Sequence, residues 1–375
     1  MSVMNARRRP LIAGSALAGA SALSLLTLSA CGSGDTGTTE GGKLNVVASF
    51  YPMEFVAERV GGEHVAVTTL TGPGVEPHDL ELSPRQTAEL TEAGVVVYLE
   101  GMQPAVDEAV GQSDARQVVE AGALAEEAAG AEGGTAPHGD GDGGDEHGDE
   151  HGGGEHEDGD GGEHGGGEHE HEHGHGDEPA GEEPTGEPTA EESGHDHDHD
   201  HGGQDPHIWL DPVQYAAVAE GVGEALAEAD PDHAADYRKN AEDLVGELER
   251  LDTEFADGLR NTDTDTFITT HAAFGHLAAR YGLHEEAIAG LSPESDPSGA
   301  RLKELHAVAE EDGVTTVFFE TIASDRTARS LATDLGLRTD VLDPVEGITD
   351  GSRGDDYFEV MRANLEALRK ALGAA

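Results

Sequence analysis

The chain has 375 residues and a formal net charge of −57 at pH 7, with 78 acidic residues against 21 lysines and arginines. Because so acidic a chain repels other polyanions, we expect no nucleic-acid partner, and cations are the natural ligands. The length allows two domains plus an unstructured segment.

The amino terminus has the features of an export signal. A basic segment precedes an apolar run at 11–28, which is shorter and less apolar than a membrane span. The run ends in Leu-Ser-Ala-Cys, which is similar to a bacterial lipobox with Cys31 as the lipidated residue; a plain signal peptide is the alternative. Cys31 is the only cysteine, so no internal disulfide or thiolate metal site forms. We predict a lipoprotein signal peptide over 1–30, lipidation of Cys31 and a flexible tether over 31–42.

The first half of the mature chain alternates strand-like and helix-like segments. Apolar runs predict strands at 44–50, 65–70, 95–99 and 117–120. Helical patterns lie at 53–60 and 84–93, the second opened by Ser83-Pro84.

A low-complexity segment interrupts this pattern at 130–204. Residues 132–201 carry 25 acidic residues and 13 of the 21 histidines. Such a composition buries too little apolar surface to offset chain entropy, so we expect a disordered loop. Its alternating imidazoles and carboxylates can chelate zinc in many arrangements, which makes it either a metal-collecting antenna or an acidic spacer.

Two helical segments follow the loop. Asp211-Pro212 begins a helix that runs to about Ala229. A longer helix is predicted by apolar residues that recur at steps of three and four, namely Tyr237, Ala241, Leu244, Leu248, Leu251, Phe255 and Leu259. We predict a linking helix over 230–261 that joins two lobes as a rigid strut; a helix packed on one lobe is the alternative.

The second half repeats the alternation. Strands are predicted at 266–270, 287–291, 314–319 and 339–342, and helices at 272–281, 297–311, 325–335 and 357–372. Strands that alternate with helices indicate an α/β fold with parallel sheets covered on both faces. We expect an amino-terminal lobe over 43–229, which contains the loop, and a carboxy-terminal lobe over 262–375.

Polar residues gather at turns and strand ends, where ligands converge in α/β proteins. Four segments have this character: Glu76-Pro77-His78-Asp79, Asp205-Pro206-His207-Ile208-Trp209-Leu210-Asp211-Pro212, Thr270-His271-Ala272-Ala273-Phe274 and Leu342-Asp343-Pro344. Together with Ser49-Phe50-Tyr51-Pro52 and Gly290-Leu291-Ser292-Pro293, they resemble the motifs of the zinc/manganese family of solute-binding lipoproteins of ABC transporters. The resemblance covers nearly the whole mature chain outside the loop.

The resemblance implies a fold and a set of metal ligands. The family fold has two small α/β lobes joined by a long rigid helix, with the metal in the cleft. Carried over residue by residue, the resemblance assigns His78 and His207 as ligands from the first lobe. It assigns His271 and Asp343 as ligands from the second lobe, with water in place of Asp343 as the alternative. Glu320 either orients a ligand or forms a structural salt bridge.

This ligand set favours Zn²⁺. Three neutral imidazoles and one carboxylate suit a tetrahedral zinc site, whereas manganese-type members of the family resemble a set with Glu where this chain has His271. The four segments also lack the His-Glu-x-x-His pattern of zinc hydrolases, so we expect no enzyme.

The resemblance also implies a function. We expect an extracytoplasmic, lipid-anchored, monomeric protein that captures Zn²⁺ and delivers it to the membrane permease of an ABC importer. Manganese or nickel binding in the same transporter class and a metal-binding adhesin are the alternatives.

Overall fold

The structure is a computed structural model that describes residues 37–39, 41–113, 115–133, 205–293 and 295–374. The signal peptide, the lipidation site Cys31 and nearly all of the 130–204 loop lie outside these residues, so the predictions made for them stay predictions. The chain forms two compact units. Of the described residues, the first unit comprises those within 1–121, 218–250 and 345–360, and the second comprises those within 122–217, 251–344 and 361–375.

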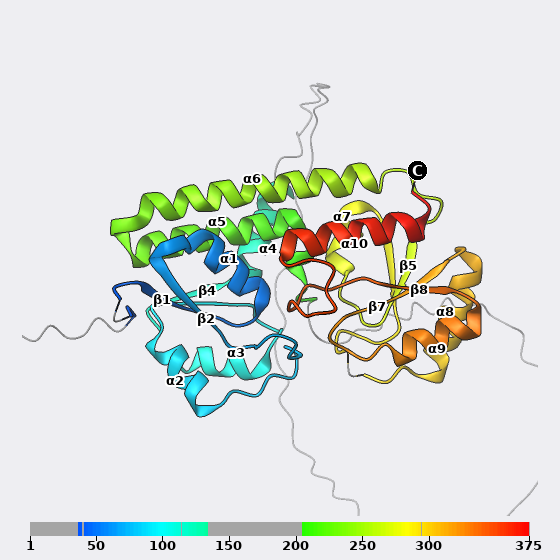
Figure 1. The fold of residues 1–375 in the computed structure, drawn as a ribbon, viewed down its shortest axis with the longest axis horizontal. Helices are drawn as coiled ribbons and strands as arrows, with labels where there is room; N and C mark the ends of the chain where they lie inside the picture. The colour runs from blue at the N-terminus through cyan, green and yellow to red at the C-terminus, as the bar shows by residue number, and fades with distance from the viewer. Residues whose placement is uncertain (1–36, 40, 114, 134–204, 294, 375) are drawn as a thin grey trace, which may run out of the picture. The chain divides into compact units, whose positions relative to one another are not determined.

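The first unit contains a four-stranded parallel sheet in the order β2-β1-β3-β4. Its strands are β1 (Leu44–Ala48), β2 (Val65–Thr69), β3 (Val95–Tyr98) and β4 (Gln117–Glu120). Helix α1 (Tyr51–Gly61) covers one face of this sheet, and α2 (Pro84–Glu92) and α3 (Pro104–Gly111) cover the other (Figure 1). Val47 and Val96 pack with Leu90 of α2 and Val106 of α3 in one apolar cluster, which fixes this second layer.

The second unit repeats this topology with the order β6-β5-β7-β8, again parallel. Its strands are β5 (Thr266–Thr269), β6 (His284–Ala287), β7 (Thr316–Phe319) and β8 (Arg338–Val341). Its shorter helices are α7 (Gly275–Tyr281), α8 (Gly299–Glu311) and α9 (Arg326–Leu335). Ile268 and Val317 of the sheet pack with Leu305 of α8 and Leu331 of α9. Two α/β lobes with parallel sheets, as predicted, are therefore confirmed.

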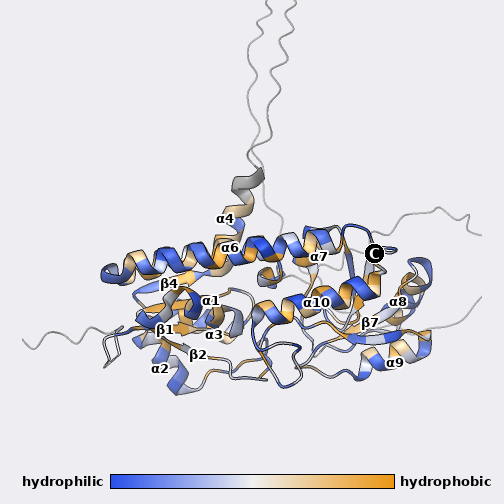
Figure 2. Cartoon of the chain, turned by 45° about the horizontal axis from the view of Figure 1, so that its top comes forward, coloured by the Kyte–Doolittle hydropathy of each residue, from blue (hydrophilic) through white to orange (hydrophobic). Residues whose placement is uncertain are grey.

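The remaining helices are α4 (Ala121–Gly133), α5 (Pro212–Ala229), α6 (Ala234–Gly258) and α10 (Tyr357–Leu372). Helix α6 is continuous and supplies residues to both units, consistent with the predicted linking helix. Its polar and apolar residues alternate along the ribbon (Figure 2). All seven apolar residues of the predicted stripe, from Tyr237 to Leu259, are buried, which confirms the face on which this helix packs. No helix in the described part of the chain is long and apolar enough to cross a membrane.

Three local predictions need correction. The strand predicted at 287–291 is wrong, because β6 is His284–Ala287. The helix predicted from residue 272 begins only at Gly275, since residues 270–274 form the turn that carries His271. Helices α3 and α4 were not predicted. By contrast, Ser83 caps α2 through a capping box with Gln86, as the Ser-Pro pair indicated.

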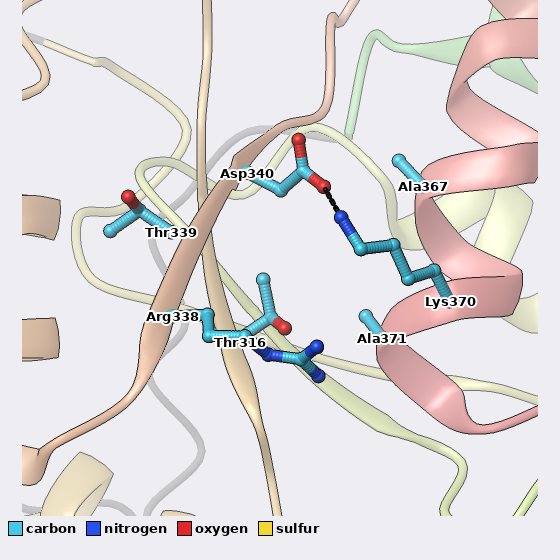
Figure 3. A pocket seen from close by; sticks show the side chains of 7 residues that line it. All are labelled: Thr316, Arg338, Thr339, Asp340, Ala367, Lys370 and Ala371. Atoms are coloured by element: carbon cyan, nitrogen blue, oxygen red, sulfur yellow. Dashed lines mark hydrogen bonds and ion pairs between the residues drawn. The ribbon is translucent and has the colours of Figure 1, made fainter.

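A cavity of about 260 Å³ lies between β7, β8 and α10 (Figure 3). Thr316 and Arg338, the first residues of β7 and β8, line it, and Lys370 of α10 forms an ion pair with Asp340 at 3.1 Å. The cavity is therefore at the amino ends of these strands. The predicted ligands of this unit, His271 and Asp343, follow the carboxyl ends of β5 and β8. The cavity is thus separate from the predicted metal ligands of its sheet.

The start of α6 is tied to the turn before β2 by two stacked imidazoles. The rings of His64 and His233 lie 3.9 Å apart, and His233 Nδ1 bonds Asp230 Oδ2 at 2.6 Å. This bond raises the pKa of His233 above its ordinary value, and the charges of Asp230 and Asp232 add to it. The protonated form is therefore favoured by folding.

The raised pKa of His233 predicts a pH-dependent contribution to stability. The contribution is fully present below the ordinary imidazole pKa of about 6.5 and is lost as pH rises through the raised pKa. We expect the thermal midpoint of His233→Gln to lie below that of the wild type at pH 6 and to approach it at pH 9. Asp230→Asn should abolish the same pH dependence. An equal gap between wild type and His233→Gln at both pH values would contradict this assignment.

Candidate metal centre

In the first unit, His78 is placed by a turn that follows β2. The buried Gln103 side chain donates to the Pro77 carbonyl at 3.2 Å and to Thr71 Oγ1 at 2.8 Å, and Thr71 Oγ1 donates to the Ser49 carbonyl. This chain of hydrogen bonds fixes the backbone immediately before His78. Residues from the segments that follow β1, β2 and β3 thus jointly hold this turn.

His78 faces a buried carboxylate in the same unit. Its Nε2 lies 3.5 Å from Oε1 of Glu346, whose side chain is fully buried, while the His78 side chain is 11% exposed. A carboxylate and an imidazole nitrogen at this distance can ligate one divalent ion. Glu346 was not predicted. The sequence feature that could have pointed to it is its position, three residues after Asp343 on the segment that follows a predicted strand.

In the second unit, His207 and His271 lie together. Their ring centroids are 5.4 Å apart, and both residues are buried. His207 Nδ1 lies 2.7 Å from Asp205 Oδ1, and His271 Nδ1 lies 2.8 Å from Glu320 Oε1. Since a carboxylate accepts, each Nδ1 donates, and each Nε2 keeps the lone pair that a metal requires. The orienting role considered for Glu320 fits this geometry; Asp205 was not predicted in such a role.

Asp205 carries negative charge toward His207. Burial alone raises the pKa of this carboxyl, but hydrogen bonds from the His207 ring and backbone lower it overall. His276 Nε2 donates to the Asp205 carbonyl at 2.9 Å, while its Nδ1 accepts from Gln214 at 3.0 Å. His276 therefore supports the Asp205 segment through hydrogen bonds.

The turn that carries His271 rests on a second buried carboxyl. Glu285 accepts the Thr269 hydroxyl at 2.7 Å and the Phe274 backbone N–H at 2.9 Å. Burial raises its pKa to about 7, and the nearby Asp205 charge acts in the same direction. The two bonds hold both ends of the 270–273 turn, so the position of His271 depends on strand β6 as well as on β5.

Asp343, the fourth predicted ligand, is buried and hydrogen-bonded through both its side chain and its backbone. Its Oδ2 accepts the Thr321 hydroxyl at 3.0 Å. Its backbone N–H donates to Asn364 Oδ1 at 2.9 Å, and its carbonyl accepts from Asn364 Nδ2 at 2.7 Å. The structure therefore places Asp343 as an anchor of the segment after β8.

The residue between Pro344 and Glu346 has an unusual backbone. Val345 has φ of 58°, and it is the one non-glycine residue with positive φ in the described part of the chain. This left-handed conformation costs roughly 1–2 kcal/mol for an L-residue. Just before it, the Trp209 indole N–H donates to the Pro344 carbonyl at 2.7 Å. A strained residue persists only where its surroundings hold it.

Comparison with known proteins agrees with these features. A family model described as zinc-uptake complex component A (ZnuA), periplasmic, matches residues 46–371. The chain belongs to the ZnuA family. The resemblance noted in the sequence is thus confirmed. Because ZnuA proteins are components of zinc-uptake complexes, the prediction that the chain is not an enzyme is confirmed as well.

Individual relatives of this ZnuA-family chain are zinc proteins by name. It is 33% identical over 332 residues to the zinc-binding lipoprotein AdcA of Streptococcus pneumoniae, covering 88% of this chain and 56% of AdcA. It therefore spans little more than half the length of that relative. It is 31% identical over 356 residues to the high-affinity zinc uptake system protein ZnuA of Bacillus subtilis, covering 92% and 94% of the two chains.

A solved structure shares the fold. The Zn(II)-bound ZnuA-like domain of Streptococcus pneumoniae AdcA superposes with a TM-score of 0.60 at 28% identity. The match covers 88% of this chain and 99% of that domain. The similarity therefore extends over both α/β units and not over one sheet alone.

Proposed function

We propose that this chain is the extracytoplasmic zinc-binding component of an ABC-type importer. One zinc ion is the cargo, bound by His78, His207, His271 and Glu346, each of which offers one ligand atom. The observation that carries the proposal is the pair of buried imidazoles, His207 and His271, whose Nδ1 atoms are both held by carboxylates. Imidazoles oriented in this way are typical of zinc sites.

The donor set fits the ion. Three neutral imidazoles and one carboxylate fill a tetrahedral shell and leave a net charge of about +1 on the zinc complex. Glu346 is our preferred carboxylate because it faces His78, whereas Asp343 binds Thr321. Harder ions such as Mn²⁺ prefer more oxygen ligands, so the donor set favours zinc over manganese.

The sequence supports a setting outside the cytoplasm. A lipobox ending at Cys31 supports export and a lipid anchor on the outer face of the cell membrane. The names of the relatives, a zinc-binding lipoprotein and a zinc uptake system protein, support delivery to an ABC permease. We propose a monomer that hands zinc to this permease.

Two isosteric carboxylate variants test the ligand set. We expect Glu346→Gln to weaken zinc binding by about 100-fold, because it removes a charged ligand from the ion. Asp343→Asn should weaken it by less than about threefold, because that carboxylate acts through a hydrogen bond.

The site-specific readout for both variants is the emission of Trp209, the sole tryptophan, whose ring lies 5.2 Å from that of His207. Chelator-buffered zinc titrations followed at this signal report events beside His207. Unchanged affinity in Glu346→Gln, or a larger loss in Asp343→Asn, would return Asp343 to the ligand set. Competition with Mn²⁺ and Ni²⁺ in the same assay tests the choice of metal.

A further inference from the structure

The strained backbone at Val345 is held from both sides. Upstream, the Asn364 amide makes two hydrogen bonds to the Asp343 backbone, and the Trp209 indole binds the Pro344 carbonyl. Downstream, the Glu346 carboxylate is fully buried and faces His78. Val345 itself is completely buried. The left-handed conformation is thus imposed by fixed neighbours.

The turn at Val345 sets the direction of the chain immediately before Glu346. Asp343 and Pro344 continue the path of β8 and are fixed in place. With extended backbone at Val345, the chain would leave Pro344 in a different direction and carry Glu346 away from its present position. The positive φ of Val345 therefore decides which way the Glu346 side chain is presented.

Trp209 links this turn to a second candidate ligand. It lies two residues after His207, in the 3-10 turn Ile208–Leu210, and its ring contacts that of His207. The segment that carries one imidazole is thereby hydrogen-bonded to the segment that carries the carboxylate.

We propose that the left-handed turn at Val345, held by the Trp209 indole and the Asn364 amide, is a positioning device that presents the Glu346 carboxylate to the metal. Val345 and Trp209 are positioning residues, and neither ligates the ion. The backbone strain is retained because it orients the ligand before zinc arrives, so that binding loses less conformational freedom. This inference rests on the proposed zinc site.

A matched pair of variants isolates the backbone from the packing. Val345→Gly and Val345→Ala both remove the buried isopropyl group, and they differ by one methyl. Glycine adopts positive φ at little cost, whereas alanine, like valine, disfavours it. If the strain is present, the glycine variant melts at a higher temperature than the alanine variant, the reverse of the usual order.

Zinc affinity should move in the same direction as stability. With full-length chains and Trp209 emission as the signal, we expect Val345→Ala to bind zinc about tenfold more weakly than Val345→Gly, because alanine disfavours the left-handed turn that presents Glu346. In a Glu346→Gln background the two variants should bind zinc equally, because the group that the turn presents is no longer a ligand. A merely structural role would give the same ratio in both backgrounds.

The outcomes separate this inference from the function on which it rests. Equal zinc affinity of the glycine and alanine variants with Glu346 present overturns the positioning role, as does a tenfold ratio that persists in the Glu346→Gln background. In both cases Glu346→Gln alone still weakens binding, so the ligand set stands. If Glu346→Gln alone binds zinc as the wild type does, the ligand set and the positioning role both fall.

Discussion

His271→Ala should weaken zinc binding at the central site by about 100-fold or more. The substitution removes one of four proposed donors and leaves the buried Glu320 carboxylate without the imidazole that it orients. The fold should survive, because Thr270 continues to donate to Glu320 and Glu285 still holds the turn through Phe274. Zinc titrations monitored at Trp209 give the affinity, and circular dichroism checks the fold.

Two further variants give zinc affinities with which His271→Ala can be compared. Glu320→Gln keeps the imidazole and weakens the hydrogen bond that orients it, so we expect a loss of about tenfold. His284→Ala, at an exposed histidine on β6, is the matched control and should bind zinc as the wild type does. An affinity for zinc that stays within about twofold of the wild type in His271→Ala would remove this residue from the ligand set.

Leu248→Ala should lower the free energy of unfolding by about 2–5 kcal/mol. Leu248 is fully buried at the middle of the apolar stripe of α6, so truncation removes apolar contacts and leaves a cavity. Glu242 lies on the exposed face of the same helix, and Glu242→Ala should change the free energy by less than about 0.5 kcal/mol. Urea denaturation of the metal-free protein measures both.

The comparison of these two α6 variants tests the burial pattern. Alanine has higher helix propensity than either replaced residue, so helix propensity cannot account for a loss in Leu248→Ala. A cost below about 1 kcal/mol for Leu248→Ala would show that the stripe contributes little to stability.

The fold was predictable where the hydrophobic pattern alone decides it. Helix α6 shows this well, since steps of three and four residues placed every buried side chain from Tyr237 to Leu259 on one face. Strand β6 shows the opposite case. It is an edge strand of polar residues, His284 to Ala287, so its pairing with β5 comes from tertiary context and not from an apolar run.

The site was predictable only in part, for a physical reason. His271 follows the end of β5 and His207 begins a 3-10 turn, and the structure brings their rings together. The carboxylate is a harder case, since Asp343 and Glu346 are three residues apart on one segment. Which of them faces an imidazole depends on the backbone of Val345, and no pattern of residue types predicts a positive φ at valine.

The polar sequence of the edge strand β6 affects association between molecules. An outer strand with unpaired backbone groups is a template on which a second molecule can add its own strand. In β6 the polar side chains of His284, Glu285 and Glu286 make such an addition unfavourable, since an added strand would remove water from polar groups. The polar sequence of β6 thus also disfavours intermolecular β-aggregation.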